Sequence, residues 1–86
     1  MKLTLNRTIE VEKNSPAFFM NKNKVVMVYE VEGELFYDSY FNIPGEKYWS
    51  CVIMNDFFPS EIDGLKECSF SEYQEKIKDF SKTLPI

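Results

Sequence analysis

The chain has 86 residues, of which 44% are hydrophobic and 28% are charged, a balance that predicts one small folded domain spanning residues 1–86. Aromatic residues make up 16% of the chain, which favours a core built on large rings. The chain contains no histidine, so its composition excludes Ser-His-Asp triads, Cys-His dyads and histidine-containing zinc sites.

The net charge is −4 and is distributed unevenly. Residues 1–24 carry five bases and two acids, residues 25–75 carry two bases and eleven acids, and residues 76–86 carry three bases and one acid. The central segment therefore has a net charge of −9, which predicts one negative face if the fold keeps these acids together. Phosphate backbones and anionic lipids repel such a protein, so we expect no direct contact with nucleic acid and no membrane binding.

The two cysteines, Cys51 and Cys68, form no CxxC motif and have no metal-ligand spacing. We expect both to be reduced thiols of a cytoplasmic protein, with a disulfide between them as the alternative. No apolar segment typical of a signal peptide is visible near Met1. The longest apolar run, residues 25–29, is far shorter than the roughly 18 residues that a membrane span requires.

Strands dominate the first two thirds of the chain. Residues 2–12 alternate between apolar and polar side chains, apart from Arg7, which is typical of one half-buried strand. Pro44 and Gly45 favour a tight turn between two later strands. The stretch 55–64 has no sustained period and predicts a connection that carries two buried or half-buried rings, Phe57 and Phe58. Altogether we expect five strands, at residues 2–12, 17–20, 24–31, 35–42 and 47–54.

The pairing of neighbouring strands can be predicted from the apolar pattern, because a one-residue slip exchanges the two faces of a strand. A three-residue loop pairs Val31 with Leu35, and we prefer it to a two-residue loop, which pairs Val31 with Glu34. The following turn is expected to place Tyr40 opposite Trp49.

The clearest helix is predicted over residues 70–83. Ser69 and Glu72 fit the S-x-x-E capping box, and Cys68 precedes the cap at the position of a hydrophobic staple. Apolar residues recur at intervals of three and four and form one stripe, namely Phe70, Tyr73, Ile77, Phe80 and Leu84. The predicted fold is therefore α+β: an antiparallel β-meander of about five strands with a C-terminal amphipathic helix packed on one face.

Residue types that carry catalysis or hold cofactors are scarce. The three glycines are isolated, which excludes a glycine-rich nucleotide loop. Asp56, Glu61 and Asp63 do not follow the spacing of a calcium loop. Cys51 has no histidine to activate it. We therefore expect no enzymatic activity, no cofactor and no metal site.

Two groups of residues are candidates for binding a partner. The first is acidic: three glutamates flank one turn and are expected to form a negative ridge, whose simpler interpretation is a solvated hairpin tip. The second is aromatic: Tyr40 and Trp49 are expected to share a sheet face opposite Tyr37 and Phe41, and such rings are favoured at interface hot spots, although they also serve as core. The candidate binding residues are Glu30, Glu32, Glu34, Asp38, Tyr40 and Trp49.

These features predict a small non-enzymatic protein-binding module, an inhibitor, immunity factor or adaptor, whose partner is a protein with a basic surface; a homo-oligomer is compatible with them. The alternative is an acidic nucleic-acid mimic that blocks a basic groove, and a carboxylate-based enzyme is a third hypothesis. No motif identifies a family. In its small size, its acidity and its richness in Lys, Asn, Ile, Phe and Tyr, the chain is similar in general character to accessory proteins of phages and mobile elements.

Overall fold

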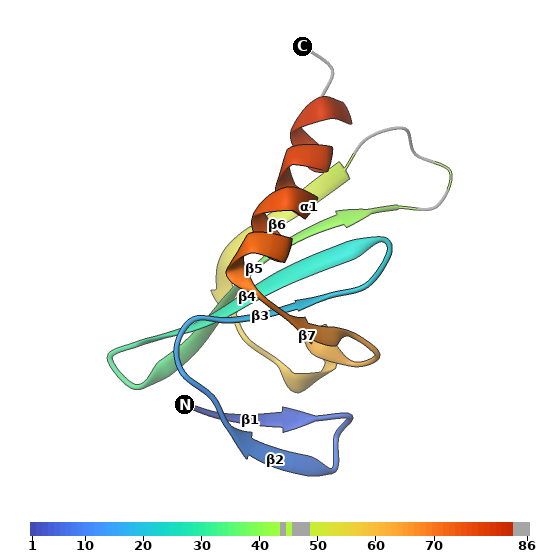
Figure 1. Cartoon of the computed structure of the whole chain (residues 1–86). Coiled ribbons are helices and arrows are strands. Elements are labelled where there is room, and N and C mark those ends of the chain that lie inside the picture. Colours follow the sequence, from blue (N-terminus) through green and yellow to red (C-terminus); the bar gives the residue numbers. More distant parts are fainter. Residues whose placement is uncertain (44, 46–48, 84–86) are drawn as a thin grey trace.

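The computed structural model describes residues 1–43, 45 and 49–83, and of residues 80–83 it describes the backbone alone. The fold is α+β, as predicted: a five-stranded antiparallel sheet, a two-stranded sheet and one C-terminal helix, α1 (Phe70–Thr83) (Figure 1).

The predicted single strand over residues 2–12 is wrong, because the chain reverses in its middle. β1 (Lys2–Leu5) and β2 (Ile9–Glu12) form an antiparallel hairpin in which Leu5 is paired with Ile9. Asn6 and Arg7 make the turn with φ angles of 50° and 64°. Asparagine tolerates this left-handed region, and the break in the apolar alternation at Arg7 marks the position of the turn.

The large sheet has the strand order β6-β5-β4-β3-β7. Its strands are β3 (Ala17–Met20), β4 (Lys24–Val31), β5 (Glu34–Asn42), β6 (Trp49–Asp56) and β7 (Lys66–Cys68). Strands β3 to β6 form the predicted meander, since each pairs with the next along the chain. The short β7, which the sequence did not predict, completes the sheet on the other side of β3.

The predicted register between β4 and β5 is wrong by one residue. Val31 is paired with Glu34, so the turn has two residues, Glu32 and Gly33, both with positive φ (52° and 82°). Two positive φ angles are the signature of a two-residue hairpin turn whose twist matches that of its strands. The geometry of this turn therefore overrides the apolar match that favoured a longer loop.

The predicted pairing of β5 with β6 is also wrong. Tyr40 is paired with Cys51, and Trp49 is paired with Asn42. A β-bulge then shifts the register, because β6 has two residues opposite Asp38 where regular pairing has one. Pro44, on which the predicted turn was centred, lies outside the described residues.

The two faces of the sheet are covered by different elements. On the hairpin face, which we define as the side of Phe19 and Val26, the β1–β2 hairpin and the 3-10 helix η1 (Pro59–Ile62) complete the main core. On the helix face, the side of Phe18 and Val25, α1 crosses β3 and β4 (Figure 1). The buried core around the hairpin face consists of Leu3, Ala17, Phe19, Val26, Val28, Tyr37 and Ile62.

The predicted connection contains the short helix η1, which begins at Pro59, a residue favoured in the first turn of a helix. Its two phenylalanines differ, since Phe57 packs against the main core and Phe58 is 61% exposed. Phe58 therefore departs from the expectation that both rings are buried or half-buried.

The capping box of α1 is confirmed. The Glu72 amide donates to Ser69 Oγ at 3.1 Å, and the Ser69 amide donates to Glu72 Oε1 at 3.0 Å. The stripe packs on the sheet through Tyr73, which is buried and whose ring lies 5.0 Å from that of Phe18. Of the other stripe residues, Phe70 is 54% exposed, and the side chains of residues 80 and 84 lie outside the description.

The packing of α1 on the sheet makes a prediction about two of its residues. Tyr73→Ala removes a buried ring and is expected to lower the free energy of unfolding by about 3–5 kcal/mol, as for other large aromatic side chains. Glu75→Ala, at an exposed position, should change it by less than about 0.5 kcal/mol. Urea denaturation measures both changes, and equal losses would show that α1 does not pack on the sheet through Tyr73.

Candidate functional site

The helix face is only partly covered. A helix is roughly 10 Å wide, whereas a strand of eight or nine residues is about 27–30 Å long. Because α1 crosses β3 and β4, the end of the β4–β5 hairpin that carries residues 32–33 extends beyond it (Figure 1). The sheet therefore presents bare surface next to this turn.

Apolar and aromatic side chains occupy this bare surface. Val31 and Met54 are 49% and 72% exposed, and Ile53 is 45% exposed. Tyr29 and Phe36 are cross-strand partners whose rings stack with centroids 6.2 Å apart. We call these five residues, Tyr29, Val31, Phe36, Ile53 and Met54, the open sheet surface.

The Asp38 carboxylate connects two residues at the centre of this region. Its Oδ1 accepts a hydrogen bond from the Tyr29 hydroxyl at 3.0 Å and one from the Met54 amide at 2.9 Å. The bulge leaves the Met54 amide without a regular ladder partner, and the carboxylate satisfies it. Burial, followed by the bond to Asp38, raises the pKa of Tyr29, so this hydroxyl stays a donor at neutral pH. Asp38 thus has a structural task that the sequence did not reveal.

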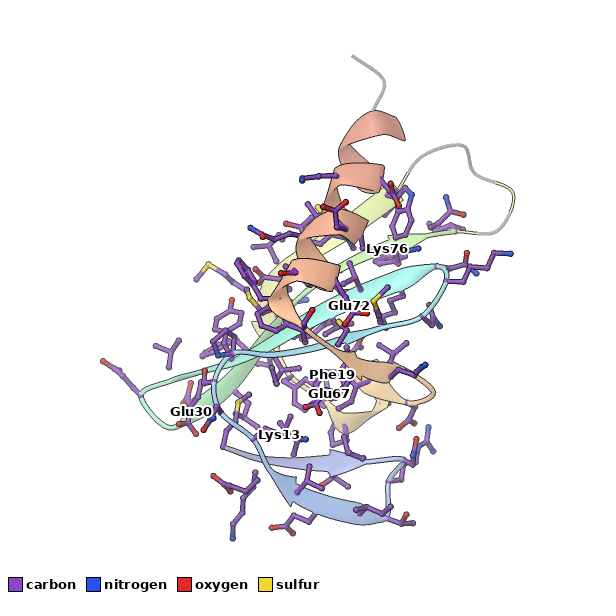
Figure 2. All side chains as sticks on the ribbon, in the orientation of Figure 1. Lys13, Phe19, Glu30, Glu67, Glu72 and Lys76 are labelled. Atoms are coloured by element: carbon purple, nitrogen blue, oxygen red, sulfur yellow. The ribbon has the colours of Figure 1, made fainter. Side chains whose placement is uncertain are left out.

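The three candidate glutamates do not form the predicted ridge. Glu30 is paired with Leu35 on the hairpin face, whereas Glu34 is paired with Val31 and lies on the helix face. Glu32 lies in the turn between them. All three are exposed, and Figure 2 shows Glu30 close to the end of the hairpin. The two-residue turn separates them, because it shifts Glu34 to the other side of the sheet.

Tyr40 and Trp49 share one face of the sheet, as predicted, although they are not directly paired. That face is the helix face, so α1 lies on the same side of the sheet as these two rings. Both are half-buried. Lys76 of α1 lies over the indole of Trp49, with Nζ 5.7 Å from the ring centroid, which is cation–π geometry. Burial, followed by the charge of Asp38, raises the pKa of Tyr40. Trp49 thus connects β6 to the helix, and its role in binding a partner stays a prediction.

The charge segregation seen in the sequence is partly cancelled by the fold. Bases from the N-terminal segment pair with acids of the central segment, and Figure 2 shows Lys13 beside Glu67. The pairs are Lys13 with Glu67 at 2.9 Å, Arg7 with Asp63 at 2.8 Å, and Lys24 with Glu61 at 3.2 Å. The acids of the β4–β5 turn therefore make up much of the negative charge that stays exposed.

An acidic rim borders the open sheet surface at the end of the sheet that carries the β4–β5 turn. Glu34 shares the helix face with Val31, and Asp56 is the cross-strand partner of Phe36. Glu32 extends the rim around the turn. Residues 25–43 contain no lysine or arginine, so this part of the sheet has no base of its own.

The described residues contain no group of three cysteine or carboxylate side chains placed to bind a metal ion. Of the acids in the predicted connection, Glu61 and Asp63 are engaged by Lys24 and Arg7. Among the residues that the structure describes, no helix has the length and apolar character that crossing a membrane requires.

Comparisons with protein-family models, with curated proteins and with solved structures find no significant match. The open sheet surface is therefore defined by geometry alone. The sequence predicted that Ile53 and Met54 belong to a regular strand. It did not reveal that they are exposed, because no residue pattern indicates the bulge.

The two cysteines allow a chemical check of the sheet. Both thiols are free and lie on opposite edge strands, β6 and β7, which excludes the alternative of a disulfide between them. Cys51 is exposed, whereas burial, followed by the charges of Glu72 and Glu67, raises the pKa of Cys68 to about 11.

We expect iodoacetamide at pH 8 to modify Cys51 and to leave Cys68 largely unmodified, because only the thiolate reacts and about 0.1% of a thiol with this pKa is ionised there. Raising the pH towards 11 should accelerate the reaction of Cys68. Peptide mass spectrometry measures both rates. Equal rates at pH 8 would contradict the partial burial of Cys68 at the end of β7, just before α1.

Proposed function

We propose that this protein is a non-enzymatic protein-binding module whose partner docks on the open sheet surface. The observation that carries the proposal is the incomplete cover of the helix face, which leaves Val31, Ile53 and Met54 roughly half to three quarters exposed beside a stacked aromatic pair. Clustered apolar surface with a polar rim is typical of protein interaction sites.

The rim indicates the chemistry of the partner. Glu32, Glu34 and Asp56 border the apolar residues, and no basic side chain of residues 25–43 balances them. A complementary partner therefore offers an apolar anchor surrounded by lysine or arginine side chains. An inhibitor, an immunity factor and an adaptor all act by such surface complementarity.

The alternative function, an acidic nucleic-acid mimic, is less favoured by the geometry. It needs a continuous acidic face, whereas Glu30 and Glu34 lie on opposite sides of the sheet. Glu61, Asp63 and Glu67 are moreover engaged in ion pairs. The apolar centre of the open sheet surface favours docking of a protein.

A double substitution tests the docking surface. Ile53→Ser with Met54→Ser removes exposed apolar groups, so the fold should persist while retention of the partner from host extract falls roughly tenfold or more, equivalent to about 1.4 kcal/mol. The control is Ile9→Ser with Phe58→Ser, which removes groups that are 54% and 61% exposed elsewhere. Quantitative mass spectrometry of the retained proteins gives the comparison. Equal retention by both variants, or no partner retained by the unaltered protein, would refute the proposal.

The acidic rim is expected to speed association. The triple variant Glu32→Gln, Glu34→Gln, Asp56→Asn should slow the on-rate roughly tenfold at low salt, and the loss should shrink as ions screen the field over about 8–10 Å. A variant with the same net charge but neutralised at Glu10, Glu12 and Glu75 is the control.

Surface plasmon resonance with the captured partner, at two ionic strengths, measures these on-rates. If the two triple variants slow association equally, net charge alone acts. If neither triple variant slows association, the three acids of the rim contribute only to solubility.

A further inference from the structure

A cavity of about 470 Å³ opens on the hairpin face, beside η1. Strands β4, β5 and β6 form its floor, and Glu61 of η1 forms part of its wall. Its volume lies within the range of small-molecule sites, which is roughly 300–1,000 Å³. The residues that line it include Lys24, Tyr37, Ser39, Phe41, Val52 and Glu61.

The buried hydroxyl of Ser39 indicates that the cavity binds a ligand. Ser39 is 1% exposed, its side chain lines the cavity, and its Oγ has no hydrogen-bond partner among the described residues. It lies in the centre of the sheet, between Val26 and Val52 in the register. A buried hydroxyl without a partner is unfavourable, and an apolar residue there would avoid the penalty. An occupant of the cavity that bonds to Oγ accounts for the serine.

The charges around the cavity favour a neutral ligand. Lys24 Nζ lies 3.2 Å from Glu61 Oε2, and each side chain is only 27% exposed, so the two charges are already balanced. A charged ligand would be desolvated there without a counter-ion. Burial, followed by the charge of Glu61, raises the pKa of Tyr37, whose hydroxyl therefore stays protonated.

The remaining lining combines apolar and amide groups. Phe41 and Val52 supply an apolar surface on the same face as Ser39. Asn21 and Asn23 of the β3–β4 turn also line the cavity, and an amide side chain both donates and accepts hydrogen bonds. The ligand should accordingly be amphipathic, with several hydroxyl groups on one edge and a C–H surface on another.

We propose that this cavity binds a small neutral carbohydrate, a mono- or disaccharide, with one hydroxyl bonded to Ser39 Oγ and a C–H face packed on Phe41. A pyranose ring carries both kinds of surface. The proposal does not depend on the docking surface, which lies on the other face of the sheet.

The test is an NMR titration of the ¹⁵N-labelled protein with glucose, galactose, mannose, N-acetylglucosamine, maltose and lactose, each to about 50 mM, since weak sites bind in the millimolar range. We expect at least one sugar to saturate, with shifts centred on the amides of Ser39, Phe41 and Val52. Ser39→Ala should weaken this binding roughly tenfold, and Phe41→Leu should weaken it too. Ser71→Ala, at an exposed serine on α1, should leave it unchanged.

Thermal unfolding provides a second readout. Because Ser39 Oγ has no partner among the described residues, Ser39→Ala should keep or raise the melting temperature, and the sugar should raise it in the unaltered protein only. The proposal is overturned if no sugar saturates, if Ser39→Ala binds as tightly as the unaltered protein, or if Ser39→Ala lowers the melting temperature, which would reveal an internal partner for the hydroxyl.

Discussion

The central strand β4 must be covered on both of its faces, and the rest of the structure follows from this constraint. Val25, Val26 and Val28 are fully buried, the first on the helix face and the other two on the hairpin face. A strand with apolar residues on both sides is stable only inside two layers. The β1–β2 hairpin and η1 supply one layer, and the single helix α1 supplies the other.

The two layers are unequal, and this inequality generates the candidate sites. A helix of 14 residues leaves the turn end of the β4–β5 hairpin bare, which gives the open sheet surface. On the hairpin face the cover ends beside η1, which gives the cavity that contains Ser39. Basic residues of the N-terminal segment pair with central acids near η1 and β7, so the exposed acids remain near the β4–β5 turn. Both sites are thus consequences of how a short chain covers a five-stranded sheet.

Local signals predicted the elements whose causes are local. The capping box at Ser69 and Glu72 and the stripe through Tyr73 are short-range features, and both lie where the sequence placed them. Turns were harder to predict, because their geometry depends on one or two φ angles. The positive φ at Arg7 and at Glu32 turned one expected strand into a hairpin and shifted another register.

The candidate site depended on features that the sequence does not show. The bulge that exposes Met54 is stabilised by the Asp38 carboxylate from the neighbouring strand, a contact between residues 16 positions apart. The acids of the turn were found from composition, but their division between the two faces follows from the turn length. The buried Ser39 hydroxyl, which has no hydrogen-bond partner among the described residues, is recognised only once β4, β5 and β6 are aligned.

In the free protein, α1 leaves part of the helix face bare. Methyl relaxation in the presence of a soluble paramagnetic agent tests it directly, because the enhancement grows with solvent exposure. We expect strong enhancement at Val31, Ile53 and Met54 and very little at Val25 and Val28. Protection of Val31, Ile53 and Met54 to the level of the buried valines would contradict it.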